Sequence, residues 1–374
     1  MTVAIVGAAE CDLGLTGLSV LGLQTQAVTR ALADAGLSLR DVDGIATTGV
    51  ARFSATSLAE HLGLQPSWTD STFAGGSAFE MFVARAAQAI EAGQCHTVVI
   101  SFASNQRSAR SRSLGGAYEA HTPEAQLEQP YGPLYPASHY AMAAGQYLHK
   151  YAATREDLAE VAVAAREWAL LNPAAYRHGA GPLTVDDVLS APMISTPLTA
   201  ADCCLVTDGG GAVVLTSLER ARDLPRPPIT VLGYGESTTN SSMSTVDDLT
   251  VTGAVASGAA AFGRAGLTPA DVDVAQVYDS FTITVLLTLE ALGFCGPGEA
   301  PGVVRDRVLP LNTSGGGLSY CHPGQLGILL LVEAVRQLRG ECGARQVPGA
   351  EVALAHGTGG ILSTHATVLL GVDR

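Results

Sequence analysis

The sequence predicts an α/β protein made of two copies of one unit. The segment AGLSLRDVD at 35–43 recurs as AGLTPADVD at 265–273, an offset of 230 residues, and six of the nine positions are identical. In both places a helical pattern precedes the segment and a short apolar run follows it. Self-similarity over so long a period, in a chain that alternates strand and helix patterns, indicates a duplicated α/β unit.

The first copy begins with a short apolar strand in MTVAIVGAA. A Gly-rich turn then leads into an amphipathic helix at 75–93, and the apolar strand HTVVISFAS follows at 96–104.

The second copy repeats this order, with a strand near residue 230, a helix at 323–341 after a Gly-rich turn, and a strand at 350–357. We therefore expect halves at 1–225 and 226–374 that pack against each other and leave a site in the cleft between them. Residues near 106–200 show helical periodicity between polar and Pro-containing loops. We interpret them as a lid or loop domain inserted in the first half.

Composition excludes several classes of function. The chain has 374 residues, of which 35 are acidic and 21 are basic, so its net charge is −14. Such a chain is a poor binder of nucleic acid or of an anionic membrane surface. No apolar run reaches the roughly 20 residues of a membrane span, and we see no basic leader. Seven cysteines without a CxxC pair predict reduced thiols, a cytoplasmic protein and no metal site.

Several long strings, in the right order, resemble the thiolase superfamily, specifically the sterol-carrier-protein or lipid-transfer-protein type. They include YAMAAGQYLHKYAATRE, ADCCLVTDGGGAVVL, YDSFTITVLLTLEALG, LPLNTSGGGLSYCHPGQLG and HGTGG. The resemblance covers nearly the whole chain. It implies the thiolase fold, in which two βαβαβαββ halves form five layers, αβαβα, with an inserted loop domain. It also implies a homodimer, because thiolase relatives pair through the strand after the nucleophile helix, which here is HTVVISFAS. In a monomer this strand would be an exposed sheet edge, which proteins avoid.

The family's nucleophilic Cys is missing. The turn that carries it has Phe73 at that position, and a phenyl ring forms no acyl-enzyme. Ser77 stands one helical turn later, and its offset makes it a poor substitute. We therefore expect no covalent route through this turn, and we expect Phe73→Ala to disturb packing more than mechanism.

The resemblance implies the other site residues. The family's His-Asp-Cys-Phe motif reads Tyr278-Asp279-Ser280-Phe281, and its Gly-His-Pro motif reads Cys321-His322-Pro323. We expect His322 to be a general base or an oxyanion donor, kept neutral by the helix start that follows it. Tyr278, with an ordinary pKa of about 10, would donate a hydrogen bond to the oxygen of a thioester or its enolate, or would shuttle a proton.

The remaining candidates carry weaker signals. Asp279 would hold the turn or orient a neighbour. Cys321, Ser280 and His356 are candidate acid/base groups, although each is as well explained as a buried structural residue. The structural alternative for Tyr278 is a buried aromatic side chain.

No permanent cofactor is expected, because coenzyme A would be part of the substrate. The turn Gly359-Gly360 and the basic residues Arg107 and Arg110 are candidates for binding it. The alternative for the two arginines is a solvated surface cluster. We expect no metal.

These residues suit a thiolase-like enzyme that makes or breaks a C–C bond next to a CoA or carrier-protein thioester, by a non-covalent aldol or retro-aldol reaction. The nearest family analogy is the lipid-transfer-protein homologues that act as aldolases on steroid side-chain CoA esters. Those homologues imply a DUF35 partner, which has an OB fold and a zinc ribbon. Two alternatives stay open: an acyltransferase or Claisen-type enzyme with another nucleophile, and a catalytically silent scaffold subunit. The sequence does not identify the acyl group.

Overall fold

The computed structural model describes residues 2–49, 51–111 and 121–373. Within these ranges one mixed sheet runs through both halves of the chain in the order β3-β2-β4-β7-β1-β8-β11-β10-β9. Its strands are β1 (Val3–Glu10), β2 (Gly44–Ala46), β3 (Trp68–Asp70), β4 (Thr97–Ser104), β7 (Gly209–Ser217), β8 (Ile229–Thr238), β9 (Val274–Val277), β10 (Val352–Gly359) and β11 (Thr364–Val372).

The sheet divides into two similar parts. Strands β1 and β8 meet only through the residue pairs at Ala4 and Ile5, so the two parts are weakly joined there. On one side of this junction lie β7, β4, β2 and β3, and on the other lie β11, β10 and β9 in equivalent order. The fifth position of the second part is a single bridge between Ala275 and Leu311. The predicted duplication is therefore confirmed.

The repeated nine-residue segment forms the same local structure twice. In the first copy the hydroxyl and N–H of Ser38 both donate to the Asp41 carboxylate, which closes a short 3₁₀ turn before β2. In the second copy Thr268 and Asp271 make the same two bonds before β9. Because this capping box fixes how the chain enters the strand, the identical Asp and the Ser/Thr pair explain the repeat.

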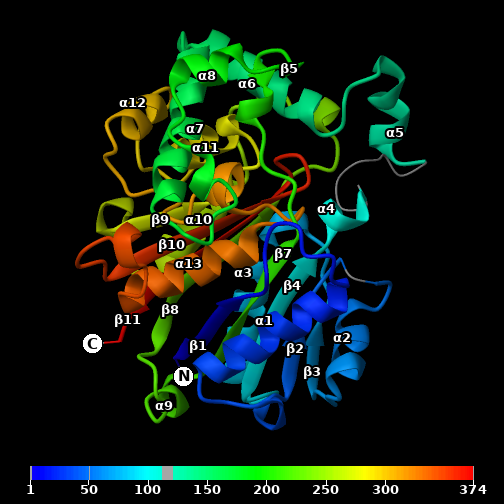
Figure 1. The fold of residues 1–374 in the computed structure, drawn as a ribbon, viewed down its shortest axis with the longest axis vertical. Helices are drawn as coiled ribbons and strands as arrows, with labels where there is room; N and C mark the ends of the chain where they lie inside the picture. Colours follow the sequence, from blue (N-terminus) through cyan, green and yellow to red (C-terminus); the bar gives the residue numbers. More distant parts are fainter. Residues whose placement is uncertain (1, 50, 112–120, 374) are drawn as a thin grey trace.

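Helices cover both outer faces and fill the space between the two parts of the sheet (Figure 1). Helix α1 packs on β1, β7 and β4, α10 packs on β8 and β11, and α3 and α13 each contact strands of both parts. This gives the expected five layers. The helices are α1 (Val20–Asp34), α2 (Ser54–Leu62), α3 (Ala78–Glu91), α9 (Leu218–Ala221), α10 (Ala254–Ala265), α11 (Thr282–Ala291), α12 (Ala300–Arg305) and α13 (Gly327–Arg339).

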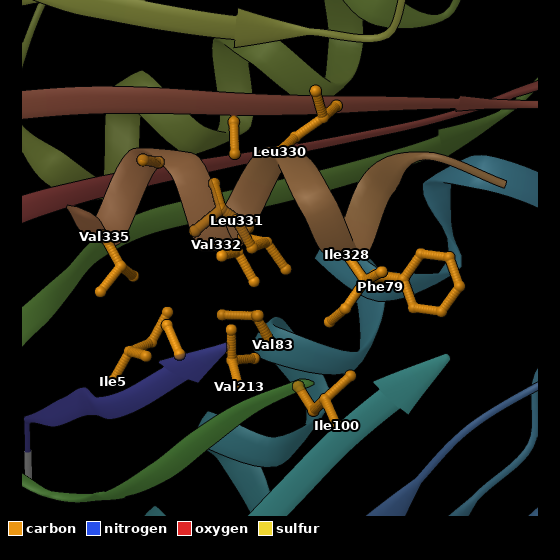
Figure 2. Packing of buried hydrophobic residues seen from close by; sticks show 14 of the residues in the cluster. Ile5, Phe79, Val83, Ile100, Val213, Ile328, Leu330, Leu331, Val332 and Val335 are labelled. Carbon is orange, nitrogen blue, oxygen red and sulfur yellow. The ribbon is translucent and has the colours of Figure 1, made fainter. Parts of the chain in front are cut away.

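Most of the buried side chains of the central layer are apolar. Figure 2 shows Val83 of α3 and Val332 of α13 facing Ile5 and Val213 of the first part of the sheet. Leu330 extends from the other side of α13 toward the strands of the second part. Burial of these side chains on both sides holds the two halves together.

The segment between β4 and β7 supplies elements that lie at the top and on the right side of Figure 1. They are α4 (Gln106–Ala109), α5 (Pro123–Leu127), α6 (Ala137–Tyr151), α7 (Arg155–Leu170), α8 (Val185–Ser190) and the hairpin β5 (Met193–Ser195) with β6 (Leu198–Thr199). Helix α7 also contacts α11 and α12. Residues 112–120 of the predicted insertion lie outside the described residues. The boundaries 1–225 and 226–374 stay a prediction. No helix in the described ranges has the length and apolarity to cross a bilayer.

The prediction that HTVVISFAS lies at a sheet edge is wrong. β4, which contains most of HTVVISFAS, pairs with β2 on one side and with β7 on the other. Its apolar sequence reflects burial inside the sheet, because strand order in an α/β sheet does not follow chain order. The end strand on this side of the sheet is β3 (Trp68–Asp70).

Candidate active site

Tyr278 and His322 form a hydrogen-bonded pair between the two halves. Tyr278 follows β9, where its N–H donates to the His356 carbonyl at 3.0 Å. Its phenol oxygen lies 2.9 Å from Nε2 of His322, and the two rings are perpendicular. Only 5% of Tyr278 and 8% of His322 is exposed. Two motifs that are 44 residues apart in sequence thus meet at one point.

Both members of the pair are neutral near pH 7. Burial lowers the pKa of His322 to about 4, because an imidazolium would lose its hydration. Burial likewise raises the pKa of the Tyr278 phenol well above 10, and the Cys204 thiol adds to the effect. The expected neutral His is found, but the cause is burial. His322 lies five residues before α13 begins at Gly327. The ordinary pKa expected for Tyr278 was wrong.

Asp279 holds the turn that precedes His322. Its carboxylate accepts hydrogen bonds from the N–H groups of Gly317 at 2.6 Å and Leu318 at 3.2 Å. The turn itself is a π-helix, Gly316–Tyr320, and a Cβ at Gly316 would stand 2.1 Å from the Asp279 carboxylate. Burial raises the pKa of Asp279 to about 7, although these N–H groups oppose the shift. The contacts make Asp279 the anchor of this turn.

Thr207, which the sequence did not single out, supports the residues after the turn. Its hydroxyl accepts the N–H of His322 at 3.0 Å and lies 3.1 Å from the Cys321 sulfur. Burial raises the pKa of the Cys321 thiol to about 12, so it stays protonated and unreactive. The Thr207 side chain therefore fixes the direction in which His322 leaves the backbone.

The glycines on both sides of the interface allow two turns to touch. A Cβ at Gly76 would lie 2.0 Å from Cε2 of Tyr278, so only Gly leaves room for the phenol ring. A Cβ at Gly359 would lie 1.8 Å from the carbonyl oxygen of Ala74. The structure thus uses Gly359 for close packing, and the Gly360 carbonyl accepts a hydrogen bond from Tyr140. Neither glycine lines the cavity described below.

The position of the missing nucleophile holds no replacement. Phe73 is 64% exposed, so its ring is not packed in the interior. This exposure does not support the expected packing effect of Phe73→Ala, and the comparison of its effects on packing and mechanism stays a prediction. The Ser77 hydroxyl is buried and bonds the Ala74 carbonyl and Thr364, both at 2.8 Å. Ser77 therefore closes the turn and is not free to attack a substrate.

Two further candidates stand apart from the pair. His356 is fully buried, with Nδ1 at 2.8 Å from the Thr367 hydroxyl and Nε2 at 3.3 Å from Nδ1 of His365. The Ser280 hydroxyl lies 3.3 Å from that of Thr284 in the first turn of α11. The structure does not bring either side chain into hydrogen-bond contact with Tyr278 or His322, and their catalytic roles stay predictions.

A cavity of about 610 Å³ lies next to the turn that precedes His322, since Leu318 and Ser319 of that turn line it. Three arginines surround it: Arg107 and Arg177 stack on the ring of Tyr176, and Arg166 reaches in from α7. Asp187 is the single acidic residue among those that line the cavity. Arg110 does not line it, so only one of the two predicted arginines is placed there.

Arg166 is the least expected member of this set. It is 9% exposed, and its guanidinium donates to the Ser319 hydroxyl at 3.3 Å and to the Gly181 carbonyl at 3.2 Å. Burial lowers the pKa of Arg166, and the charge of Arg177 lowers it further. A buried cation whose charged neighbour is another cation calls for an anion. The sequence could have indicated this residue, because Arg166 falls on the same face of α7 as a stripe of buried alanines, where a charged side chain is unusual.

The inner end of the cavity reaches the catalytic segment through Cys204 and Leu205. The N–H of Cys204 donates to the Ser280 carbonyl at 2.9 Å, and the N–H of Leu205 donates to the Gly317 carbonyl at 2.9 Å. Neither Tyr278 nor His322 lines the cavity. The pair therefore lies one layer behind the wall, whereas we expected both side chains to face the pocket.

Nothing in the described ranges gathers three metal-ligating side chains. All seven cysteines are unpaired in the structure.

Comparison with known proteins gives a consistent result. Residues 235–372 match the family described as thiolase C-terminal domain-like. The chain is 38% identical to the 17-hydroxy-3-oxo-4-pregnene-20-carboxyl-CoA lyase of Mycobacterium tuberculosis, over 95% of this chain and 96% of that protein. It is 36% identical to the steroid side-chain-cleaving aldolase of Thermomonospora curvata, over 100% and 98% of the two chains.

Solved structures agree. An Ltp2-ChsH2(DUF35) aldolase superposes with a TM-score of 0.91 at 34% identity, over 100% of this chain and 98% of the other. Human mitochondrial 3-ketoacyl-CoA thiolase superposes with a TM-score of 0.74 at 17% identity, over 100% of this chain and 99% of the other, which shows a shared fold.

Proposed function

This chain belongs to the thiolase superfamily, as an enzyme of the C–C lyase type that acts next to a CoA thioester, and from that premise we propose that it cleaves a β-hydroxyacyl-CoA with a steroid-like acyl group by a retro-aldol reaction. The observation that carries the proposal is the neutral phenol–imidazole pair of Tyr278 and His322. The full-length similarity to two steroid side-chain lyases supports the acyl class.

The 2.9 Å bond makes the two side chains one proton relay. As the β-hydroxyl proton of the substrate passes to the Tyr278 oxygen, the phenol proton passes to Nε2 of His322. The Cα–Cβ bond breaks, and the β-carbon becomes the carbonyl carbon of a ketone. The electron pair of the broken bond forms the thioester enolate. Return of the proton through Tyr278 to Cα completes the reaction.

The same geometry argues against an acyl-enzyme. Phe73 replaces the nucleophile, and Ser77 is occupied by two hydrogen bonds. Burial raises the pKa of the Cys204 and Cys321 thiols, so neither supplies a thiolate near pH 7. We therefore prefer the lyase to the acyltransferase, and the intact pair to a silent scaffold.

We further propose that the cavity binds the phosphates of coenzyme A. Arg107, Arg166 and Arg177 would supply the cationic donors, and Cys204 marks the end at which the thioester approaches the pair. Guanidinium groups bind phosphate through paired, charge-assisted hydrogen bonds. Because Arg166 is buried, its charge is the least stabilised of the three by water when no phosphate is bound.

We expect Arg166→Gln to raise the Kd of free coenzyme A by about tenfold, because a hydrogen bond to a charged group contributes about 1.5–3 kcal/mol. Isothermal titration calorimetry measures the change. Arg110→Gln is the matched control, since Arg110 does not line the cavity. Equal losses in the two variants, or no loss in either, would remove the phosphate assignment.

A homodimer is proposed through β3, the end strand, in place of β4. The Thr69 side chain is exposed at the centre of this strand. An unpaired strand edge favours pairing with a second copy. We expect the wild-type chain and Thr69→Val to be dimers by light scattering at micromolar concentration, and Thr69→Pro, which removes an N–H donor, to be monomeric. A monomeric wild-type chain would contradict the proposed homodimer.

A DUF35 protein is the proposed second partner, because the Ltp2-ChsH2(DUF35) aldolase resembles this chain over its whole length. Unpaired cysteines support a reducing, cytoplasmic location. Co-expression of this chain with a DUF35 protein, followed by affinity purification, tests the pairing.

The function is tested by incubating the enzyme, alone and with a DUF35 partner, with 17-hydroxy-3-oxo-4-pregnene-20-carboxyl-CoA. A retro-aldol reaction yields a 17-ketosteroid and a three-carbon acyl-CoA in equal amounts. Loss of substrate with release of free coenzyme A and no ketone would point to hydrolysis and contradict the proposal.

A further inference from the structure

Tyr140 connects the inserted segment to the catalytic pair. It lies on α6 and is 4% exposed. Its hydroxyl donates to the Gly360 carbonyl at 3.1 Å, and its ring stacks on Phe281 with centroids 4.4 Å apart at 25°. Neither contact is required to form α6, so both serve to place α6 against the second half of the chain.

Both partners of Tyr140 belong to segments that adjoin Tyr278. Phe281 is three residues further along the same segment. Gly360 stands in the turn that packs against the first half, where a Cβ at Gly75 would come within 2.9 Å of the Gly360 nitrogen. The next residue, Gly76, is in contact with the Tyr278 ring. Because these residues are closely packed, a shift of Gly360 would displace the turn at Gly76 and with it the Tyr278 ring.

The hydroxyl of Tyr140 stays protonated at neutral pH. Burial raises the pKa of Tyr140 to about 12, while a hydrogen bond with Ser280 opposes the rise. Tyr140 in turn contributes to the raised pKa of Tyr278. At neutral pH the Tyr140 hydroxyl can therefore keep its hydrogen bond to the Gly360 carbonyl.

We infer that Tyr140 is a positioning residue that holds the Tyr278 phenol in line with Nε2 of His322 through its hydrogen bond to Gly360 and its stacking on Phe281. The inference rests on the proposed function of that pair. It assigns a role to α6 beyond covering the site: the inserted segment completes the catalytic geometry.

The test compares Tyr140→Phe with Tyr147→Phe. Both substitutions remove a buried phenol hydroxyl from the same helix, but the Tyr147 hydroxyl donates to Glu290, away from the pair. We expect Tyr140→Phe to lower kcat per folded site by about tenfold, the effect of losing one ordinary hydrogen bond, with KM for the acyl-CoA within about twofold. Tyr147→Phe should keep kcat, whatever its Tm.

A second readout does not depend on activity. Nitrogen-15 NMR of the histidine rings reports the hydrogen bond at Nε2 of His322, and we expect this signal to move in Tyr140→Phe and to stay in place in Tyr147→Phe. Wild-type kcat in Tyr140→Phe, beside an inactive Tyr278→Phe, overturns the inference and leaves the function standing. An inactive wild type refutes the proposed function. In that case the NMR readout still tests the inference, and an unchanged His322 signal in Tyr140→Phe contradicts the positioning role of Tyr140. If Tyr140→Phe does not fold, Phe281→Leu replaces it under the same criteria.

Discussion

Tyr278→Phe is expected to lower kcat by at least about 100-fold, because removing one donor at a reacting centre typically costs about 100- to 1,000-fold. The phenylalanine ring still fills the space against Gly76, so the fold should persist. His322→Ala should lose as much, since the relay then lacks its acceptor. Steady-state kinetics on a β-hydroxyacyl-CoA, normalised to folded protein, measures both.

The same pair predicts the pH dependence. His322 accepts a proton only when it is neutral, and its pKa is about 4. The part of kcat that depends on neutral His322 should therefore be full well above pH 4 and should fall as the pH drops through 4.

His356→Gln is the comparison variant for the first prediction, because the His356 ring bonds Thr367 and His365. It should retain kcat per folded site. If Tyr278→Phe and His322→Ala keep wild-type turnover while His356→Gln loses it, the pair is not the catalytic group.

Glu80→Gln is expected to stabilise the protein at neutral and alkaline pH. Glu80 lies in the first turn of α3, is 1% exposed, and neither carboxyl oxygen has a hydrogen-bond partner. Gly327 and Gly357 leave just enough room for it, with a Cβ at Gly357 only 2.2 Å from the carboxyl. Burial raises the pKa of Glu80 to about 8 from its ordinary 4.5.

The sign follows from proton linkage. The folded state keeps the proton of Glu80 up to about pH 8, whereas the unfolded state releases it near pH 4.5. Stability is therefore full below pH 4.5 and is lost as the pH rises toward 8. At pH 7 the difference of roughly 2.5 pH units corresponds to about 3 kcal/mol, which the neutral Gln avoids.

Denaturant unfolding at pH 5 and pH 8 measures this effect. The gain from Glu80→Gln should be small at pH 5 and large at pH 8. Glu91→Gln, an exposed residue at the end of the same helix, is the control and should change little at either pH. A Glu80→Gln protein with wild-type stability at pH 8 would show that the carboxyl finds a partner or water.

Much of this architecture was predictable because it depends on local chemistry. The Ser38 and Thr268 capping boxes repeat in sequence and therefore in structure. The Tyr278 and His322 motifs could be paired because the family resemblance places both turns at the interface between the halves.

The rest depends on packing that no local pattern records. The apolar run in β4 was mistaken for an edge, since a central strand of a mixed sheet and an edge strand covered by a partner have similar sequences. The neutrality of His322 comes from burial by both halves, and a helix start was the wrong cause. Arg166 and Arg177 converge with Arg107 only after the inserted segment folds.

Rapid-quench mass spectrometry of the intact protein during turnover tests the central claim most directly. A non-covalent retro-aldol reaction predicts that the chain keeps its unmodified mass at every time point while ketone and shortened acyl-CoA accumulate. An acyl adduct that forms and decays at the rate of turnover would contradict the account, because it would place a nucleophile where the structure has none.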